Sequence, residues 1–125
     1  MQYMLLIYDQ EKIWQDMSKE EAQKYFAEYM QFTQSIKDSG HFIAGDALQS
    51  ITTATCVRTR NGKVQTTDGP FAETKEQLGG YYLINAKDLD EARQIAARIP
   101  SSKLGTIEIR PVMVYDQQQE RADNK

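Results

Sequence analysis

The sequence predicts an α+β domain in which one antiparallel β-sheet carries two α-helices on a single face. Runs typical of strands and helices follow in the order strand, helix, hairpin, strand, helix, strand, which is the order of a split βαβ sandwich. The runs Gln2–Tyr8 and Tyr81–Asn85 are apolar at both alternating sets of positions, as expected of central strands covered on both faces. With 125 residues, the chain is long enough for one core and too short for two.

The first strand and the first helix have clear limits in the sequence. Tyr3–Tyr8 is a short apolar run, as expected of a buried strand. Ser18 and Glu21 have the spacing of a capping box, so a helix is expected to begin at Ser18. Gly40 ends that helix, because glycine adopts the left-handed conformation readily. The predicted apolar face of the helix comprises Ala22, Tyr25, Phe26, Tyr29, Thr33 and Ile36.

The middle of the chain predicts a β-hairpin. Residues 41–53 show an irregular pattern, whereas Thr53–Arg60 and Lys63–Thr67 are β-prone runs joined by Asn61-Gly62. Asn-Gly suits the two positive φ angles of a tight hairpin turn. We expect the second strand of this hairpin to pair with Tyr81–Asn85 in the main sheet.

The last third of the chain predicts a second helix and a final strand. Asp88 caps the helix and Pro100 ends it. Its predicted buried face comprises Leu89, Ala92, Ile95, Ala96 and Ile99. The strand Thr106–Val114 alternates apolar and charged side chains. Residues 1–115 are therefore expected to form a single domain, and residues 116–125 a polar, frayed tail.

One face of the predicted sheet lacks a cover. In a ferredoxin-like fold the right-handed crossovers place both helices on the same face, while the two central strands are apolar on both. A second copy of the chain, packed sheet to sheet, is the simplest cover, because most soluble oligomers are symmetric. Such an interface buries roughly 800 Å² per partner. The alternative cover is a large apolar ligand.

Composition excludes several function classes. The net charge of −3, from 15 basic and 18 acidic residues, attracts neither nucleic acid nor an anionic membrane. The single Cys56 permits no internal disulfide and belongs to no metal-binding pattern, so we expect a cytoplasmic protein without a metal. Cys56 itself is expected in the core. No phosphate-binding glycine loop or nucleophile elbow is present, so no cofactor is expected.

The run from Asp68-Gly69-Pro70-Phe71 to Gly79-Gly80 resembles the signature of the DGPF family, a branch of the YCII-related proteins. The resemblance extends from Gln2 to Tyr115. It implies a relative of the dimeric α+β barrels. In the wider family a histidine on the first helix and an acidic residue are the suspected catalytic pair, but residues 18–39 of this chain contain no histidine. Some relatives are joined to, or encoded beside, transcription sigma factors.

Three residues are candidates for proton transfer. Asp68 begins the signature loop, which is expected at the same sheet edge as Tyr8 and the start of the first helix; a buried carboxylate there would act as a general base. His41 is the only histidine, and Asp46 follows it closely enough to pair with it. The structural alternatives are a turn-forming role for Asp68 and a helix-capping role for His41.

Four further residues are candidates for ligand binding. Arg58 carries a guanidinium group, which binds carboxylates and phosphates in a fixed geometry, although an exposed position on its strand is the alternative. Tyr8 and Tyr82 combine apolar area with a polar hydroxyl, which suits an aromatic ligand or a dimer core. Phe71 is the apolar residue of the signature loop.

Two functions stay open from the sequence. The first is a binding or regulatory module with a small ligand in a cavity between two subunits. The second is a cofactor-free lyase, isomerase or oxygenase that acts on an aromatic or acidic substrate through Asp68 or a His41–Asp46 pair. The fold accommodates both, so fold alone does not choose.

Overall fold

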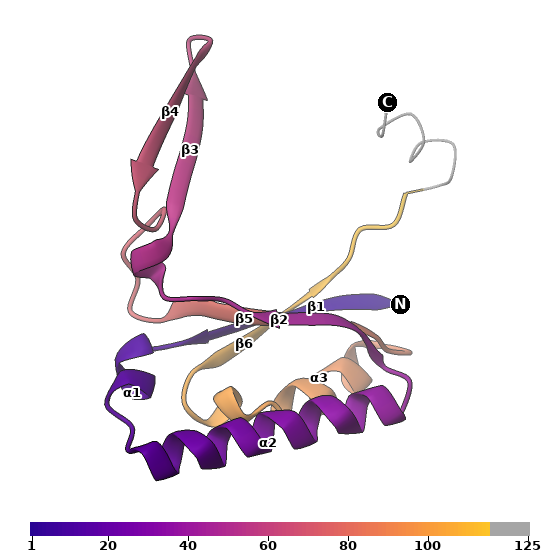
Figure 1. Ribbon diagram of the computed structural model, residues 1–125. Coiled ribbons are helices and arrows are strands. Elements are labelled where there is room, and N and C mark those ends of the chain that lie inside the picture. The colour runs from indigo at the N-terminus through magenta and orange to yellow at the C-terminus, as the bar shows by residue number, and fades with distance from the viewer. Residues whose placement is uncertain (116–125) are drawn as a thin grey trace.

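The computed structural model describes residues 1–115 and shows a four-stranded antiparallel sheet with helices on one face (Figure 1). The strand order is β2-β5-β1-β6, with β1 and β5 in the centre. The strands of this sheet are β1 (Gln2–Asp9), β2 (Phe42–Ala47), β5 (Gln77–Asn85) and β6 (Thr106–Pro111). The helices are α1 (Glu11–Gln15), α2 (Lys19–Asp38) and α3 (Leu89–Ala97), and two 3₁₀ turns are η1 (Ile51–Thr53) and η2 (Pro100–Lys103).

The core lies between the sheet and the helices α2 and α3. On β1, Tyr3, Leu5 and Ile7 are buried against the helices, whereas the intervening residues are partly exposed. Burial is complete for Leu5, Ile36, Ile84 and Ile99, which come from both central strands and from the helical layer. The prediction that the central strands lie at β1 and β5 is therefore confirmed.

Both predicted helix starts are confirmed. The Ser18 hydroxyl accepts a hydrogen bond from the Glu21 amide at 3.1 Å, and the Asp88 carboxylate accepts one from the Glu91 amide at 2.9 Å. Gly40 follows α2 with φ +81°, as expected for a glycine that ends a helix. These caps satisfy amide groups that a helix leaves unpaired in its first turn.

The predicted hairpin exists but lies outside the main sheet. Its strands, β3 (Thr55–Arg60) and β4 (Lys63–Asp68), form a separate two-stranded ladder, and Asn61 and Gly62 have the expected positive φ angles of 54° and 75°. The edge neighbour of β5 is instead β2, from the segment expected to be irregular. An irregularity between Phe42 and Ala44 interrupts the register of β2, so the alternating pattern that indicates a strand is lost.

Several smaller expectations were wrong. The short helix α1 was not predicted, since five residues are too few to show a helical period. Phe26 and Leu89 are 66% and 43% exposed rather than buried, and Cys56 is only partly buried, because it lies on the hairpin. The last strand ends at Pro111 instead of Val114. The predicted polar tail, residues 116–125, lies outside the described residues.

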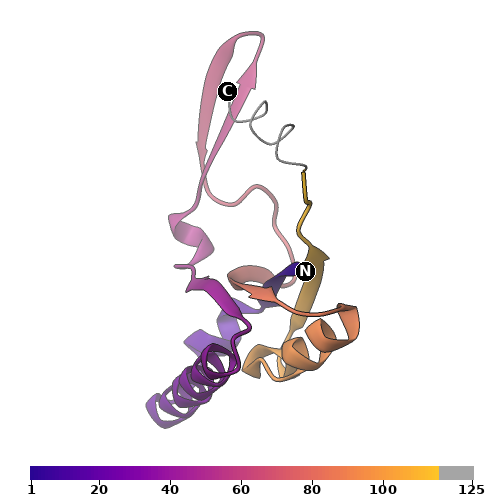
Figure 2. The same ribbon diagram turned by 90° about the vertical axis from the view of Figure 1, so that its right-hand side faces the viewer.

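The face of the sheet opposite the helices is uncovered in this chain. Met4, Leu6 and Leu83 lie on it and are partly exposed. The β3–β4 hairpin, called the arm below, projects from this side of the sheet, away from α2 and α3 (Figures 1 and 2). The arm leaves the body beside the β2 edge (Figure 2).

Among residues 1–115, no helix combines the length and the hydropathy needed to cross a lipid bilayer.

Candidate functional site

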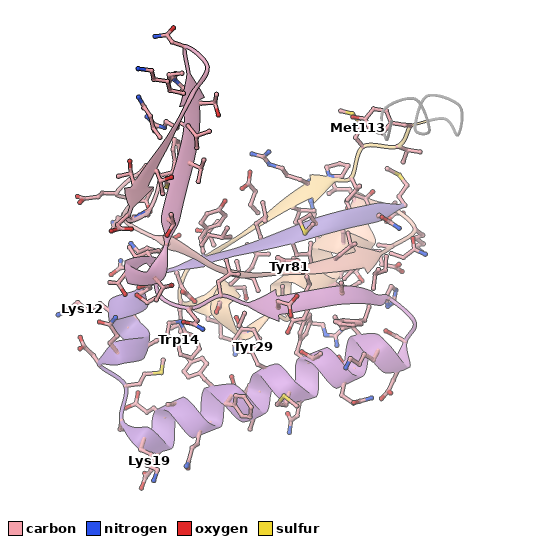
Figure 3. All side chains as sticks on the ribbon, turned by 45° about the horizontal axis from the view of Figure 1, so that its top comes forward. Lys12, Trp14, Lys19, Tyr29, Tyr81 and Met113 are labelled. Atoms are coloured by element: carbon pink, nitrogen blue, oxygen red, sulfur yellow. The ribbon has the colours of Figure 1, made fainter. Side chains whose placement is uncertain are left out.

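A cleft with a volume of about 680 Å³ opens between α2 and the β2 side of the sheet. Its floor is formed by the central strands, and its walls come from α1, α2 and the segment that follows β2. The lining includes the aromatic residues Trp14, Phe26, Tyr29, Phe42 and Tyr82. In Figure 3, Trp14 on α1 and Tyr29 on α2 lie near each other between the helices and the sheet. A concave, largely aromatic cleft of this size is typical of a small-molecule site.

The cleft contains a buried carboxylate, Asp9, which is 5% exposed. Its Oδ2 atom accepts hydrogen bonds from Trp14 Nε1 at 2.9 Å and from the Ser101 hydroxyl at 2.8 Å. The Tyr29 hydroxyl is hydrogen-bonded to Ser101 as well. Since Ser101 has one hydroxyl proton and donates it to Asp9, Tyr29 must be the donor to Ser101. A relay of hydrogen bonds therefore runs from Tyr29 through Ser101 to Asp9.

Local sequence explains the position of Asp9. It is the last residue of β1, and a register shift between Ile7 and Tyr8 precedes it. The alternation of β1 still directs its side chain to the helix-covered face, as for Ile7. The helix α1 begins two residues later, which brings Trp14 over the carboxylate.

A second carboxylate, Glu11, fixes the wall of the cleft. Its two oxygens accept hydrogen bonds from the Ser50 hydroxyl at 2.8 Å and from the Ile51 amide at 2.9 Å. The Glu11 amide donates to the side-chain oxygen of Gln77 at 3.0 Å. Glu11 thereby ties α1 to η1 and to the start of β5. Because its acceptor atoms are occupied, Glu11 is suited to holding the site together rather than to chemistry.

The tyrosines of the cleft keep their protons well above neutral pH. Burial raises the pKa of Tyr29 to about 12, although its hydrogen bond to Ser101 acts in the opposite direction. Burial also raises the pKa of Tyr82, whose hydroxyl is 2.6 Å from the Thr33 hydroxyl on α2. The ring of Trp14 lies 6.3 Å from that of Tyr29, and the ring of Phe42 lies 6.4 Å from that of Tyr82. The cleft thus offers aromatic surface and neutral hydroxyl groups.

The mouth of the cleft is apolar. Phe26, Met30 and Leu48 line it and are 66%, 56% and 51% exposed. Lys37 supplies the one basic side chain of the lining, and its ammonium nitrogen lies 5.0 Å from the centre of the Phe42 ring. Asp46 lies on the rim and accepts a hydrogen bond from the Tyr81 hydroxyl at 2.9 Å. That hydrogen bond is the main cause of the raised pKa of Tyr81.

The structure brings only two of the predicted site residues into the cleft, Asp46 and Tyr82. His41 contacts other partners, because its ring nitrogens hydrogen-bond to the Ser39 hydroxyl at 2.7 Å and to the Glu91 carboxylate at 3.0 Å. Asp46 bonds to Tyr81 instead of His41. The expected His41–Asp46 pair is therefore not formed. The role of Asp46 in proton transfer and the role of Tyr82 in ligand binding stay predictions.

The other predicted residues lie elsewhere. Asp68 and Arg58 are exposed on the arm, and Phe71 is 81% exposed in the loop that follows it. Tyr8 lies on the uncovered face of the sheet, where its hydroxyl donates to Glu108 at 3.3 Å. Burial and the Glu108 carboxylate raise the pKa of Tyr8. The catalytic role of Asp68 stays a prediction, but Asp68 is not in the cleft.

Sequence reasoning missed Asp9, Trp14 and Ser101 as site residues. Asp9 had a signal, since a charged residue ends the most apolar strand of the chain. Trp14 and Ser101 had none, because α1 and η2 are too short for a period. Within residues 1–115 no group of three or more histidine, cysteine, aspartate or glutamate side chains is arranged to hold a metal ion.

Comparison with known proteins gives consistent results. The family model of the YCII-related domain matches residues 1–116 of the chain. The uncharacterized protein R00369 of Rhizobium meliloti (strain 1021) is 34% identical over 117 residues, which cover 92% of this chain and 94% of that protein. Among solved structures, 5-chloro-2-hydroxyhydroquinone dehydrochlorinase (TftG) from Burkholderia phenoliruptrix AC1100, in complex with 2,5-dihydroxybenzoquinone, is similar with a TM-score of 0.56. That likeness has 13% sequence identity and covers 90% of this chain and 94% of that chain, so it concerns the fold alone.

Proposed function

This chain belongs to the YCII-related family, and from that premise we propose that it is a small cofactor-free enzyme. The proposed reaction is proton transfer on a hydroxylated ring compound bound in the cleft between α2 and the sheet. Asp9 is the proposed general base. The observation that carries the proposal is the burial of its carboxylate in an aromatic cleft, with two hydrogen bonds that both end on Oδ2.

The geometry around Asp9 favours a chemical role for its second oxygen. Trp14 and Ser101 hold Oδ2 and fix the plane of the carboxylate. Oδ1 lies beside Gly79, where a side chain would begin 3.6 Å from it. A general base must come within hydrogen-bonding reach of the proton that it takes, and the absence of a side chain at Gly79 leaves a ring substituent room to approach. Buried, oriented carboxylates of this kind are typical of catalytic sites.

The proposed chemistry needs only residues of the cleft. Asp9 takes a proton from a hydroxyl group or a carbon of the substrate, and the ring delocalises the negative charge that develops. The proton then returns to another atom of the ring in an isomerisation, or a substituent leaves with the electron pair in an elimination. The neutral hydroxyls of Tyr82 and Thr33 share one hydrogen bond, so the hydroxyl that accepts it keeps its own proton to donate to substrate oxygen.

The lining indicates the class of substrate. Its aromatic side chains favour a flat ring through stacked or edge-on contacts, and the apolar mouth favours a compound with little charge. The structurally similar TftG is named for a chlorinated hydroxyhydroquinone and was solved with a dihydroxybenzoquinone. Hydroxylated benzenes and quinones are therefore the first compounds to test.

The single tryptophan of the chain gives a direct assay, because Trp14 lines the cleft. A panel of hydroxylated benzenes and quinones is titrated against tryptophan fluorescence, and compounds that bind are followed for turnover by absorbance. We expect Asp9→Asn to bind such a compound and to lose turnover by about 100-fold or more, as for loss of a general base. Asp16→Asn, an exposed aspartate that does not line the cleft, is the matched control and keeps turnover within a few-fold.

Equal turnover in Asp9→Asn and wild type would contradict the proposal. Circular dichroism checks that Asp9→Asn keeps the fold. We expect it to do so, because the asparagine oxygen can still accept hydrogen bonds from Trp14 and Ser101.

A second candidate function is a binding or regulatory module whose ligand lies between two subunits. We propose that the chain adopts a ferredoxin-like arrangement and forms a cytoplasmic homodimer through its sheet, without nucleic-acid or membrane contacts. We also assign it to the DGPF branch on the residues Asp68-Gly69-Pro70-Phe71. The partly exposed Met4, Leu6 and Leu83 on the uncovered face support the dimer. Binding of a panel compound without turnover, and without any effect of Asp9→Asn, would favour the module.

A further inference from the structure

We propose that the β3–β4 arm is a clasp that holds a second copy of the chain. This inference goes beyond the proposed cleft chemistry and rests on the homodimer suggested above. It assigns a role to a segment that the cleft does not use, and it names the side of the arm that packs against the partner. Four observations support it: the exposure of the arm, its two unlike sides, its length and its charge.

The arm is exposed along its whole length. Every residue of β4, and every residue of β3 except Cys56, is exposed in the single chain. The two strands are joined at the base of the arm by the Gly69 amide, which donates to the Ala54 carbonyl at 2.8 Å, and by Cys56 Sγ, which is 3.1 Å from the Gly69 carbonyl oxygen. A two-stranded hairpin by itself is marginally stable in water. We therefore expect the arm to pack against another protein surface.

The two sides of the arm differ in chemistry. The register pairs Val57 with Thr66 and Thr59 with Val64. Since neighbouring residues of a strand point to opposite sides, one side of the arm comprises Thr55, Val57, Thr59, Val64 and Thr66, with Asp68 beside Thr55 at its base. The other side carries Arg58, Arg60, Lys63 and Gln65. The first side, with Val57 and Val64 at 62% and 70% exposure, is the one suited to packing.

The arm is longer than the gap between two packed sheets. Each of its strands has six residues, which span roughly 20 Å at about 3.3 Å per residue. Two sheets packed face to face lie about 10 Å apart. The arm projects from the uncovered side of the sheet (Figures 1 and 2). In a sheet-to-sheet dimer it must therefore pass the partner's sheet and lie along the partner's flank.

The distribution of charge also favours a second copy of the chain as the partner of the arm. The arm, residues 55–68, carries three basic side chains and one acidic one, so the rest of the chain has a net charge of −5. A positive arm and a negative body attract each other at long range as two copies approach, which speeds association without contact between the basic side and the partner. The basic side also discourages uncontrolled edge-to-edge strand pairing, as charged residues do on exposed strands. We infer that the valine side contacts the partner's flank and the basic side faces outward.

The decisive experiment compares two double variants by sedimentation equilibrium. Val57→Glu with Val64→Glu places two acids on the packing side, and Gln65→Glu with Thr67→Glu places two acids on the outward side. We expect the first pair to raise the dissociation constant of the dimer by roughly 10,000-fold, about tenfold for each of the four valines that two arms bury in a symmetric dimer. The second pair makes the same change of charge and is expected to raise it by less than about tenfold. Circular dichroism checks that both variants keep the body folded.

A cross-link identifies the surface that the arm touches. A photoreactive benzoylphenylalanine at position 64 is activated in a mixture of isotope-labelled and unlabelled protein, and the products are mapped by mass spectrometry. We expect a link between copies, to the edge strand β2 or β6 of the second copy. A monomeric wild type would overturn both clasp and dimer and leave the Asp9 proposal standing. A dimer unaffected by Val57→Glu with Val64→Glu, or linked only within one chain, would overturn the clasp alone.

Discussion

The Ser101 hydroxyl donates a hydrogen bond of 2.8 Å to Oδ2 of Asp9, and both side chains are buried. The two residues are 92 positions apart in the sequence, at the end of β1 and within η2. This bond joins the first strand to the turn that precedes the last strand, so the carboxylate of the cleft is also part of the frame of the fold. Chemistry and stability at Asp9 must therefore be separated by the choice of substitution.

Asp9→Ala is expected to lower the free energy of unfolding by about 2–3 kcal/mol, because it leaves the donors of Trp14 and Ser101 without their acceptor. Asp9→Asn keeps an acceptor oxygen and is expected to lose less than half as much. Urea denaturation followed by circular dichroism measures both variants. Equal loss in the two would mean that the negative charge, rather than the acceptor, stabilises this part of the fold.

The paired glycines of β5 are expected to respond differently to alanine. At Gly80 a Cβ would lie 2.8 Å from the Asp46 carbonyl oxygen and 3.3 Å from the Ala47 Cα, so the backbone of β2 must shift. Gly80→Ala is expected to destabilise the protein by about 1–3 kcal/mol. At Gly79 the Cβ meets Oδ1 of Asp9 at 3.6 Å, an ordinary contact, and the change should be within about 0.5 kcal/mol. Thermal unfolding of the two variants tests this contrast.

Stability is expected to fall between pH 10 and about 12 as the unfolded chain, but not the folded one, loses the Tyr29 proton. Burial raises the pKa of Tyr29 from 10.0 to about 12 in the folded state. The stabilisation is therefore fully present below pH 10 and is lost as the pH rises through 12. The loss amounts to at most about 2 kcal/mol after allowance for partial exposure.

The measurement is urea denaturation of the wild type and of Tyr29→Phe at pH 9, 10, 11 and 12. The difference between the two proteins should shrink steadily over this range. A difference that does not change with pH would contradict the assignment of the titration to Tyr29.

Removal of the cap of α2 has a local effect. The Ser18 hydroxyl accepts from the Glu21 amide and donates to the Glu21 carboxylate, each at 3.1 Å. Ser18→Ala is expected to lower stability by about 1 kcal/mol, and Ser18→Asp by much less, because aspartate also caps helices. Neither change should alter ligand binding in the cleft, since Ser18 does not line it. Altered tryptophan fluorescence titrations in Ser18→Ala would show that α2 moves as a whole.

Much of the fold could be predicted because its signals are local. Ser18, Gly40 and Asp88 set helix ends through contacts within a few residues, and Asn61-Gly62 sets a hairpin turn by its own φ angles. The pairing of the hairpin was wrong for the opposite reason. Whether β2 or the hairpin lies beside β5 depends on contacts such as Phe42 with Tyr82, which no short window of sequence contains.

The candidate site was predicted poorly for a related reason. The sequence indicated Asp68 and His41 as residues for proton transfer because their residue types are reactive. In the structure, Asp68 is exposed and His41 is hydrogen-bonded to Ser39 and Glu91. Reactivity depends on burial and on partners, and Asp9 acquires both only when η2 reaches it. The expected location between two sheets also differs from the cleft, which lies on the helix side of the sheet.

By itself, the sequence determined the types of most elements, the first residues of α2 and α3, the YCII-related family and an apolar sheet with helices enough for one face, because these follow from residues that are near neighbours or from their alternation. Only the tertiary structure decided which strand is the edge neighbour of β5, that the hairpin stands free as an arm, and that Asp9 meets Trp14 and Ser101 in a cleft. These features depend on packing between residues far apart in the chain, where many arrangements satisfy the same local pattern and the buried contacts of the whole fold select one.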